Sequence, residues 1–205
     1  MSDIGSFYGG SLLVMCGKDS VIIAGDKRHG MRFITTNTER TSIYKINNKC
    51  FVGLTGFLPD CQFLIEHLKK HIQLFEITEN KEIDAEELAY LLKFILYSFR
   101  KKSPLYLTPV VAGIKDGKPV CISMDCLGCI SDPKTFVAAG TAEDNLNGIC
   151  EALFVADFDE DQLFTNAMQA FLNATDRDAF SGWGAECYII TEKKCRKRVL
   201  KGRVD

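Results

Sequence analysis

Two cysteines and two histidines in this chain have spacings typical of metal ligands. Cys126 and Cys129 are separated by two residues, and His67 and His71 lie four residues apart within a helical pattern. Structural zinc usually takes four ligands from two spaced pairs, and a zinc protease needs a glutamate beside its first histidine. No second CxxC occurs, and Leu-Lys-Lys separates the histidines. We therefore expect no metal and no cofactor, with the thiols in a turn and the histidines on a solvated or interface-facing side.

Two further motifs fail on their spacing. Gly17-Lys18 would need an earlier glycine and a following serine or threonine to form a phosphate loop, and the chain has Leu12 and Asp19 there. A Ser-His-Asp hydrolase would place its serine in a GxSxG elbow, and none occurs. These motifs alone indicate no enzyme.

The C-terminal run KKCRKRVLKGR contains seven basic residues. Such a run can bind nucleic acid or an anionic membrane. Here Arg, Val and Leu alternate and no aromatic residue is available to stack on bases. We expect a charged edge strand or a tail that docks on a neighbouring subunit, with no nucleic-acid and no membrane partner.

Length and composition favour one soluble domain spanning residues 1–205. The chain is 46% hydrophobic and 25% charged, and its net charge is −2, so it has no strong overall field. No apolar run is long enough for a membrane span, and the start lacks the features of a signal peptide. We expect an intracellular protein whose nine cysteines are thiols.

The hydrophobic periodicity changes several times along the chain. It predicts a helix after Pro59, with Asp60 as its N-cap, and a second helix that starts at Asp84 with Glu87 in a capping box. Two more helices are expected at 142–153 and 160–178. Strands are expected at 11–15, 20–25, 32–36, 43–46, 50–55, 107–114, 119–124, 135–139, 185–191 and 196–200.

This order of strands, two helices, strands, two helices and strands indicates the α+β class. Two sheets packed face to face, each covered on its outside by a helix pair, would bury every apolar stripe. The expected architecture is a four-layer αββα sandwich.

Four stretches together resemble one family in register over nearly the whole chain. They are GGSLLVM…SVIIAGDKR, FVGLTGFLPDCQFL, AAGTAEDNLNGICEALF and DRDAFSGWGAECYIIT, and they look like a proteasome β-type subunit. The resemblance implies the N-terminal-nucleophile hydrolase fold. In active members, self-cleavage after a glycine exposes a threonine whose hydroxyl attacks the peptide carbonyl while its own amine serves as the base.

Carried over by this resemblance, part of the family's active site is present. The matching positions are Asp26, the turn glycine Gly56 with its oxyanion-binding amide, Thr141 for a serine, Asp178 and Ser181. Two decisive positions depart: Gly9 falls where the threonine is expected, and Ser42 where the lysine is expected. The resemblance therefore implies a non-catalytic subunit with a vestigial site.

An alternative alignment keeps a nucleophile. Cleavage between Gly10 and Ser11, removing residues 1–10, would give Ser11 a hydroxyl beside a free amine. This alternative predicts an active N-terminal-nucleophile peptidase, although it does not restore the lysine.

The resemblance also implies partners and a setting. It predicts a place in an inner β ring, among α and β subunits in stacked seven-membered rings, in a particle of the cytoplasm and nucleus that carries out ATP- and ubiquitin-dependent degradation. Substrate would be contacted only through a neighbouring active subunit. In related subunits the turn matching 124–129 reaches the neighbour's substrate pocket, so Asp125 is expected to lend negative charge there and Cys129 to line its wall.

Overall fold

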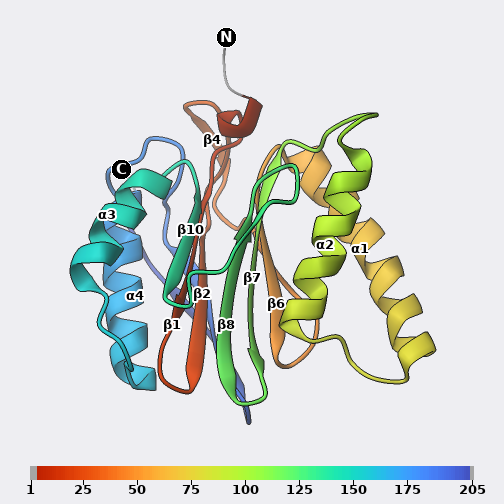
Figure 1. Ribbon diagram of the computed structural model, residues 1–205. Helices are drawn as coiled ribbons and strands as arrows, with labels where there is room; N and C mark the ends of the chain where they lie inside the picture. The colour runs from red at the N-terminus through yellow and green to blue at the C-terminus, as the bar shows by residue number, and fades with distance from the viewer. Residues whose placement is uncertain (1–3, 204–205) are drawn as a thin grey trace.

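Two antiparallel five-stranded sheets face each other in the computed structural model, which describes residues 4–203 (Figure 1). The first sheet has the order β10-β1-β2-β11-β12, and the second has the order β5-β6-β7-β8-β9. The strands of the first sheet are β10 (Phe136–Gly140), β1 (Ser11–Cys16), β2 (Ser20–Asp26), β11 (Ala185–Thr191) and β12 (Cys195–Leu200). Those of the second are β5 (Ile43–Lys45), β6 (Cys50–Gly56), β7 (Leu107–Lys115), β8 (Lys118–Met124) and β9 (Ile130–Ser131).

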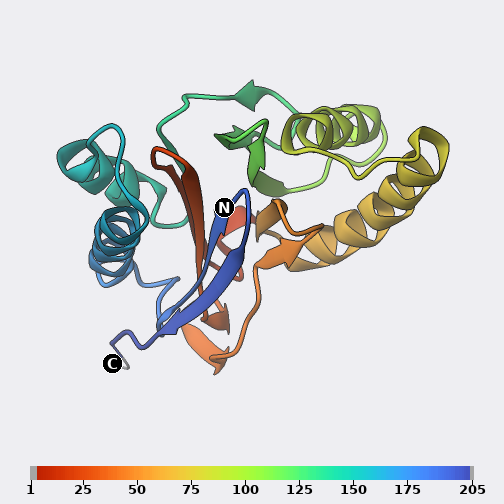
Figure 2. The ribbon, with the colours of Figure 1, turned by 90° about the horizontal axis from the view of Figure 1, so that it is seen from below.

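A helix pair covers the outer face of each sheet, as the view from below shows (Figure 2). Helices α1 (Leu58–Glu79) and α2 (Ala85–Phe99) lie on the second sheet, and α3 (Glu143–Leu153) and α4 (Glu160–Thr175) on the first. A short 3-10 turn, η1 (Ile4–Ser6), precedes β1. The predicted α+β class and four-layer αββα sandwich are confirmed.

Three apolar clusters correspond to the three layer boundaries. One lies between α1, α2 and the second sheet, one between α3, α4 and the first sheet, and one between the two sheets. Every residue of β1, β2 and β6 is buried, because both faces of these central strands are covered. Burial on both faces explains why these strands are apolar without polar alternation.

Three local predictions were wrong. Asp60 does not cap α1: the N-cap is Phe57, and the Asp60 carboxylate instead accepts a hydrogen bond from the Tyr106 amide at 2.8 Å. The single strand at 32–36 is a hairpin of β3 (His29–Met31) and β4 (Ile34–Asn37), because Arg32 turns the chain with a left-handed φ of 54°. The last helix ends at Thr175, which leaves Asp178 in the following loop.

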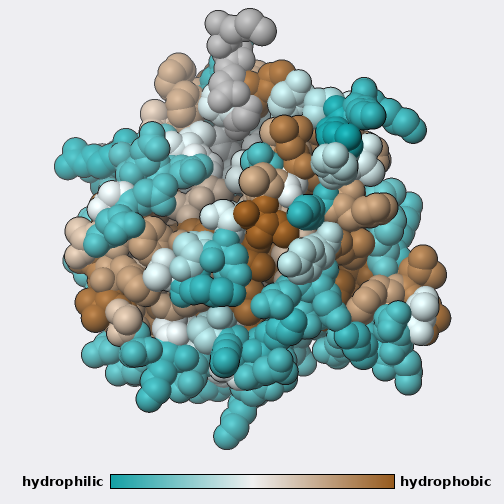
Figure 3. Space-filling view, in the orientation of Figure 1, coloured by the Kyte–Doolittle hydropathy of each residue, from teal (hydrophilic) through white to brown (hydrophobic). Residues whose placement is uncertain are grey.

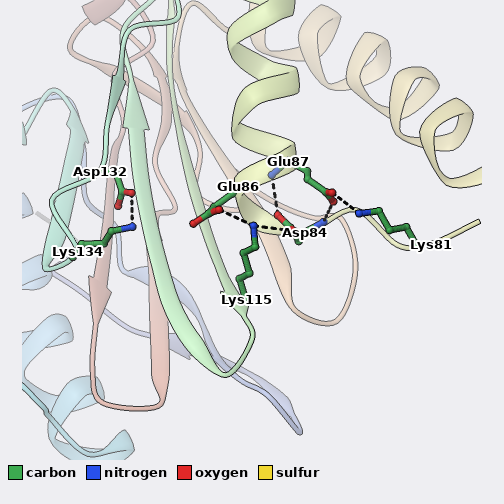
Figure 4. A network of polar contacts seen from close by, with 7 residues as sticks. All are labelled: Lys81, Asp84, Glu86, Glu87, Lys115, Asp132 and Lys134. Carbon is green, nitrogen blue, oxygen red and sulfur yellow. Dashed lines mark hydrogen bonds and ion pairs between the residues drawn. The ribbon is translucent and has the colours of Figure 1, made fainter. Parts of the chain in front are cut away.

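The predicted start of α2 is confirmed. Asp84 accepts a hydrogen bond from the Glu87 amide at 2.8 Å, and the Glu87 carboxylate accepts one from the Asp84 amide at 3.1 Å. Lys115, at the end of β7, pairs with Glu86 at 2.6 Å and with Asp84 at 3.3 Å (Figure 4). These contacts attach the helix to the second sheet at one end and satisfy its first amide donors.

Candidate functional site

Ser11, the first residue of β1, lies where the two sheets open toward the N-terminal end of the chain. Its backbone N–H donates to the Asp26 carboxylate at 3.0 Å, across the β1–β2 pair. Its hydroxyl donates to the Ser181 hydroxyl at 3.2 Å and accepts from the Ala142 amide at 2.9 Å. The side chain is 1% exposed. Ser11 is therefore bonded at both its nitrogen and its oxygen, and its nitrogen is part of a peptide bond.

Asp178 anchors the hydroxyl groups around Ser11. Its Oδ2 atom accepts from the Ser181 hydroxyl at 2.6 Å and from the Thr141 hydroxyl at 2.5 Å. Its Oδ1 atom accepts from the Phe180 amide at 3.1 Å. We call Ser11, Thr141, Asp178 and Ser181 the hydroxyl network. The structure brings together three residues that the resemblance placed in the site, and it adds Ser11.

Asp26 is buried beneath this network. Its two oxygens accept from the amides of Ser11 and Gly182, the latter at 3.3 Å. Burial raises the pKa of Asp26 to about 6, while the nearby Arg40 guanidinium and the amide donors lower it. Burial therefore outweighs the arginine and the amide donors in setting the pKa of this carboxyl.

The two glycines ahead of Ser11 face different neighbours. A Cβ atom at Gly9 would lie 2.1 Å from the backbone oxygen of Phe180, whereas one at Gly10 would lie 2.4 Å from Nη1 of Arg40. Both have positive φ, 69° and 122°. Neither position carries a hydroxyl, and the space beside Gly10 is filled by a guanidinium.

Arg40 and Ser42 form the other side of the site, which we call the arginine side. Arg40 is 7% exposed and donates from Nη1 to the Gly9 carbonyl at 2.5 Å. Its Nε and Nη2 atoms and the Ser42 hydroxyl are buried and have no partner within residues 4–203. Ser42 lies over Gly25, where a Cβ atom would meet its Oγ at 2.4 Å. The buried cation beside Gly10 comes from Arg40, two residues before the position where the resemblance expects a lysine.

The Gly10 carbonyl is also held at the site. It accepts from the Thr55 hydroxyl and from the Thr141 amide, both at 3.0 Å. Gly56 follows Thr55 at the end of β6, with a φ of 119° and with Leu107 as its partner in the sheet. Gly56 is placed beside the site by its neighbour Thr55, and its role as an oxyanion donor stays a prediction.

Asp125 and Cys129 lie in the turn between β8 and β9. The Asp125 Oδ1 atom accepts from the Leu127 amide at 2.9 Å and from the Cys129 amide at 2.7 Å, so the carboxylate shapes its own turn. Both side chains are exposed, and their contact with a neighbouring subunit stays a prediction.

The remaining motifs have structural surroundings. The imidazoles of His67 and His71 lie 4.5 Å apart, and His67 packs on Phe63 and Phe99. The predicted charged edge strand is β12, where Lys197 pairs with Glu186 at 2.9 Å. Within residues 4–203, no group of three potential metal ligands is found, and all nine cysteines are free. No helix in that range is long and apolar enough to cross a bilayer.

Sequence reasoning missed the two buried arginines. Arg28 is 2% exposed and donates to the carbonyls of Phe180 and Arg32 and to the Thr35 hydroxyl. Arg40 occurs in the polar stretch ERTS, which has no apolar periodicity. Nothing in such a stretch distinguishes a buried guanidinium from a solvated one, whereas Arg28 could have been suspected from the preceding buried strand.

Comparison with known proteins agrees with this geometry. The model of the "Proteasome subunit" family matches residues 6–190. The proteasome subunit beta type-3 of Saccharomyces cerevisiae is 40% identical, with both chains covered completely. The beta type-3 subunit of Drosophila melanogaster is 39% identical over 98% of each chain, and the probable one of Schizosaccharomyces pombe is 38% identical over 97% of this chain and 98% of its own. The chain belongs to the proteasome subunit family.

Proposed function

We propose that this chain is a non-catalytic, structural β subunit of the proteasome core particle, of the beta type-3 kind. One observation carries the proposal: the start of β1 offers no free nucleophile. Gly9 and Gly10 have no side chain, and Ser11 is tied by its amide to Asp26 and by its hydroxyl to Ser181 and Ala142. A glycine carries only hydrogen in place of a side chain, so it has no atom that could form an acyl bond with a substrate.

The arginine side supports the same conclusion. An amine that acts as a base needs a neighbouring cation that lowers its proton affinity and leaves room for the substrate carbonyl. Ser42 supplies no charge, and the Arg40 guanidinium fills the space that a side chain at Gly10 would take. Glycine at position 9 in place of the nucleophile and serine at position 42 in place of the lysine would together explain a site that keeps its hydrogen-bond network and cannot cleave a peptide.

The test is the intact mass of this subunit taken from the native particle, together with its labelling by a peptide carrying an electrophilic group. We expect the residues before Ser11 to remain attached and the label to appear only on other subunits. Loss of residues 1–10 with an adduct on Ser11 would establish the alternative, a peptidase that uses Ser11. The contact of the Gly10 carbonyl with Thr55 and Thr141 is the feature that favours this alternative, because it polarises the bond that would break.

The role that follows is architectural. The chain would fill one position in an inner β ring between α and β neighbours, in stacked seven-membered rings that enclose the degradation chamber of the ATP- and ubiquitin-dependent pathway. A ring of different subunits needs surfaces that fit only their own neighbours. The expected location is the cytoplasm and nucleus. Native size separation with identification of the co-migrating subunits by mass tests this placement, and migration as a small free protein would contradict it.

Asp125 and Cys129 are proposed to border the substrate pocket of an adjacent active subunit. The Asp125 Oδ2 atom accepts no hydrogen bond within residues 4–203, so its charge is available to a basic substrate residue. Asp125→Asn keeps the Oδ1 acceptor that forms the turn and removes only the charge. We expect slower cleavage after basic residues by the assembled particle and unchanged cleavage after apolar residues. Unchanged cleavage after basic residues would reduce Asp125 to a turn-forming residue.

A further inference from the structure

Helix α2 exposes a row of aromatic side chains on the side that faces away from the second sheet. Tyr90, Phe94 and Tyr97 are 65%, 68% and 54% exposed. Their spacing of i, i+4 and i+7 places them on one face of the helix, opposite the buried Leu88 and Leu92. Figure 3 shows hydrophobic side chains among polar ones on the surface over α2. We call Tyr90, Phe94 and Tyr97 the aromatic stripe.

Contacts within the chain leave the aromatic stripe largely uncovered. The hydroxyls of Tyr90 and Tyr97 make no hydrogen bond within residues 4–203, and only the Arg100 guanidinium covers the ring of Tyr97, 3.5 Å from its centroid. In the same range, the other helix pair exposes no large hydrophobic side chain on α3 or α4, and Val155 is exposed in the loop between them. Neighbouring exposed apolar side chains are typical of an interaction surface, so the two helix layers differ in function.

Unpaired cations lie at the C-terminal end of the stripe. Lys101 continues the same helix face, four residues after Tyr97. Four cations in this region make no ion pair within the described part of the chain: Lys93, Arg100, Lys101 and Lys102. The helix dipole favours cations beyond the last turn, but it does not account for Lys93, which lies midway along α2.

The N-terminal end of α2 is different, because its charges are neutralised within the chain. Glu86 pairs with Lys115 at 2.6 Å, and Glu87 pairs with Lys81 (Figure 4). The free charge beside the aromatic stripe is therefore positive and confined to one end. Charge complementarity favours a partner that carries carboxylates at the matching end.

A helix fits this surface in length and in charge. The stripe spans seven residues, about 10 Å along the axis, and a partner helix with apolar residues at i, i+4 and i+7 has a stripe of the same length. Carboxylates are most favourable in the first turn of a helix. A partner whose acidic first turn lies beside Lys101 runs antiparallel to α2. A second copy of this chain fits less well, since α3 and α4 offer carboxylates without an exposed apolar stripe.

We propose that the aromatic stripe and the cations at its C-terminal end form a docking surface for an amphipathic helix of another protein, with an apolar stripe and an acidic first turn, antiparallel to α2. No residue of the site around Ser11 belongs to α2, and the docking surface does not depend on the proposed function.

The experiment measures binding of a fluorescent peptide to the free full chain by polarisation. The probe is a synthetic peptide locked as a helix by a side-chain staple, with leucines at i, i+4 and i+7 and glutamates in its first turn. One matched peptide has glutamines in place of the glutamates, and another has the glutamates in its last turn. The emission of Trp183, the single tryptophan, shows that each variant is folded.

We expect Phe94→Ser to raise the Kd of the probe about ten-fold, because it removes the centre of the stripe. Ile34→Ser, at an exposed position of β4, is the control and should change nothing. The double variant Lys93→Glu, Lys101→Glu should also raise the Kd about ten-fold and abolish its salt dependence. Lys18→Glu in the exposed β1–β2 turn should leave both unchanged.

Equal binding of the glutamine peptide, or an unchanged Kd in Phe94→Ser, would overturn the proposal. So would absence of peptide binding together with binding of phosphatidylserine vesicles or single-stranded DNA that needs Lys93 and Lys101. Self-association of the chain that Phe94→Ser abolishes would assign the surface to a second copy instead. Equal binding of the peptide with glutamates in its last turn would overturn the antiparallel direction. All these measurements use the free chain, so they are separate from the tests of assembly and of Ser11.

Discussion

The two sides of the site around Ser11, the hydroxyl network and the arginine side, differ in how completely their polar atoms are paired. In the hydroxyl network, Ser11, Thr141 and Ser181 all have hydrogen-bond partners, and both Asp178 oxygens accept. On the arginine side, two nitrogens of Arg40 and the Ser42 hydroxyl have none within residues 4–203. Native proteins pair nearly all buried polar groups, so the second side is the exception.

This difference shows which part of the site also holds the fold together. The hydroxyl network joins the start of β1, the start of α3 and the loop before β11, so it holds three elements together even without a nucleophile. The hydroxyl of Ser42, at the position where the resemblance predicts a lysine, has no hydrogen-bond partner within residues 4–203. A change at Ser42 should therefore disturb the fold less than a change in the hydroxyl network.

The largest expected effect comes from Asp26, which both sides share. In Asp26→Ala, the amides of Ser11 and Gly182 lose their acceptor, and the Arg40 guanidinium loses a nearby opposite charge. We expect the free energy of unfolding to fall by roughly 3–5 kcal/mol. Denaturant titration measures this, and Asp19→Ala in the exposed β1–β2 turn is the control, with a change below about 0.5 kcal/mol.

The next effect distinguishes the two glycines. Gly9→Ala forces a Cβ atom against the Phe180 backbone oxygen, which cannot move independently, whereas Gly10→Ala meets the end of a flexible side chain. We expect Gly9→Ala to destabilise the protein by roughly 3 kcal/mol and Gly10→Ala by less, each with a backbone penalty of roughly 1–2 kcal/mol.

A double-mutant cycle sharpens this comparison. Arg40→Ala should recover part of the cost of Gly10→Ala and none of the cost of Gly9→Ala, because only Gly10 faces the guanidinium. Equal recovery for both glycines would mean that Arg40 does not fill the space beside Gly10.

The pH dependence of the free energy of unfolding reports on the Asp26 carboxyl, which lies between the hydroxyl network and the arginine side. The folded-state pKa of Asp26 is raised to about 6 by burial, above its ordinary value of 3.8, so between these values the folded chain binds a proton that the unfolded chain has lost. The contribution of Asp26 to stability therefore falls as pH rises from about 4 to about 6, with a slope of at most about 1.4 kcal/mol per pH unit.

The measurement is an NMR titration of the Asp26 carboxyl in the wild-type chain and in Arg40→Met. The pKa should be higher still in the variant, since Arg40 lowers it by charge attraction. A lower value, or an unchanged one, would place Arg40 too far from Asp26 to act as its counter-charge.

Much of the fold follows from the sequence because its signals are local. The Asp84 capping box and the helical spacing of Leu64, Leu68 and Ile72 mark α1 and α2 directly, and the all-apolar strands predict burial on both faces. Asp60 failed as a cap because its carboxylate bonds to Tyr106, a contact 46 residues away that no local pattern encodes.

The sequence predicted those parts of the candidate site whose residues lie close together in the chain. The pairing of Asp178 with Ser181 lies within one short loop, and the resemblance names both residues. Arg40 reaches the site by its side-chain conformation, from a stretch whose composition indicates only a polar loop.

The smallest effects separate two buried serines of the same size. Ser181→Ala removes the hydroxyl that links Ser11 to Asp178, and we expect it to cost roughly 1–2 kcal/mol. Ser42→Ala removes a buried hydroxyl that has no partner, so the unfolding free energy should stay within roughly 0.5 kcal/mol of the wild type or rise. Parallel denaturant titrations give both values. If Ser42→Ala costs as much as Ser181→Ala, the Ser42 hydroxyl has an ordered partner such as water, and the two sides of the site are equally well paired.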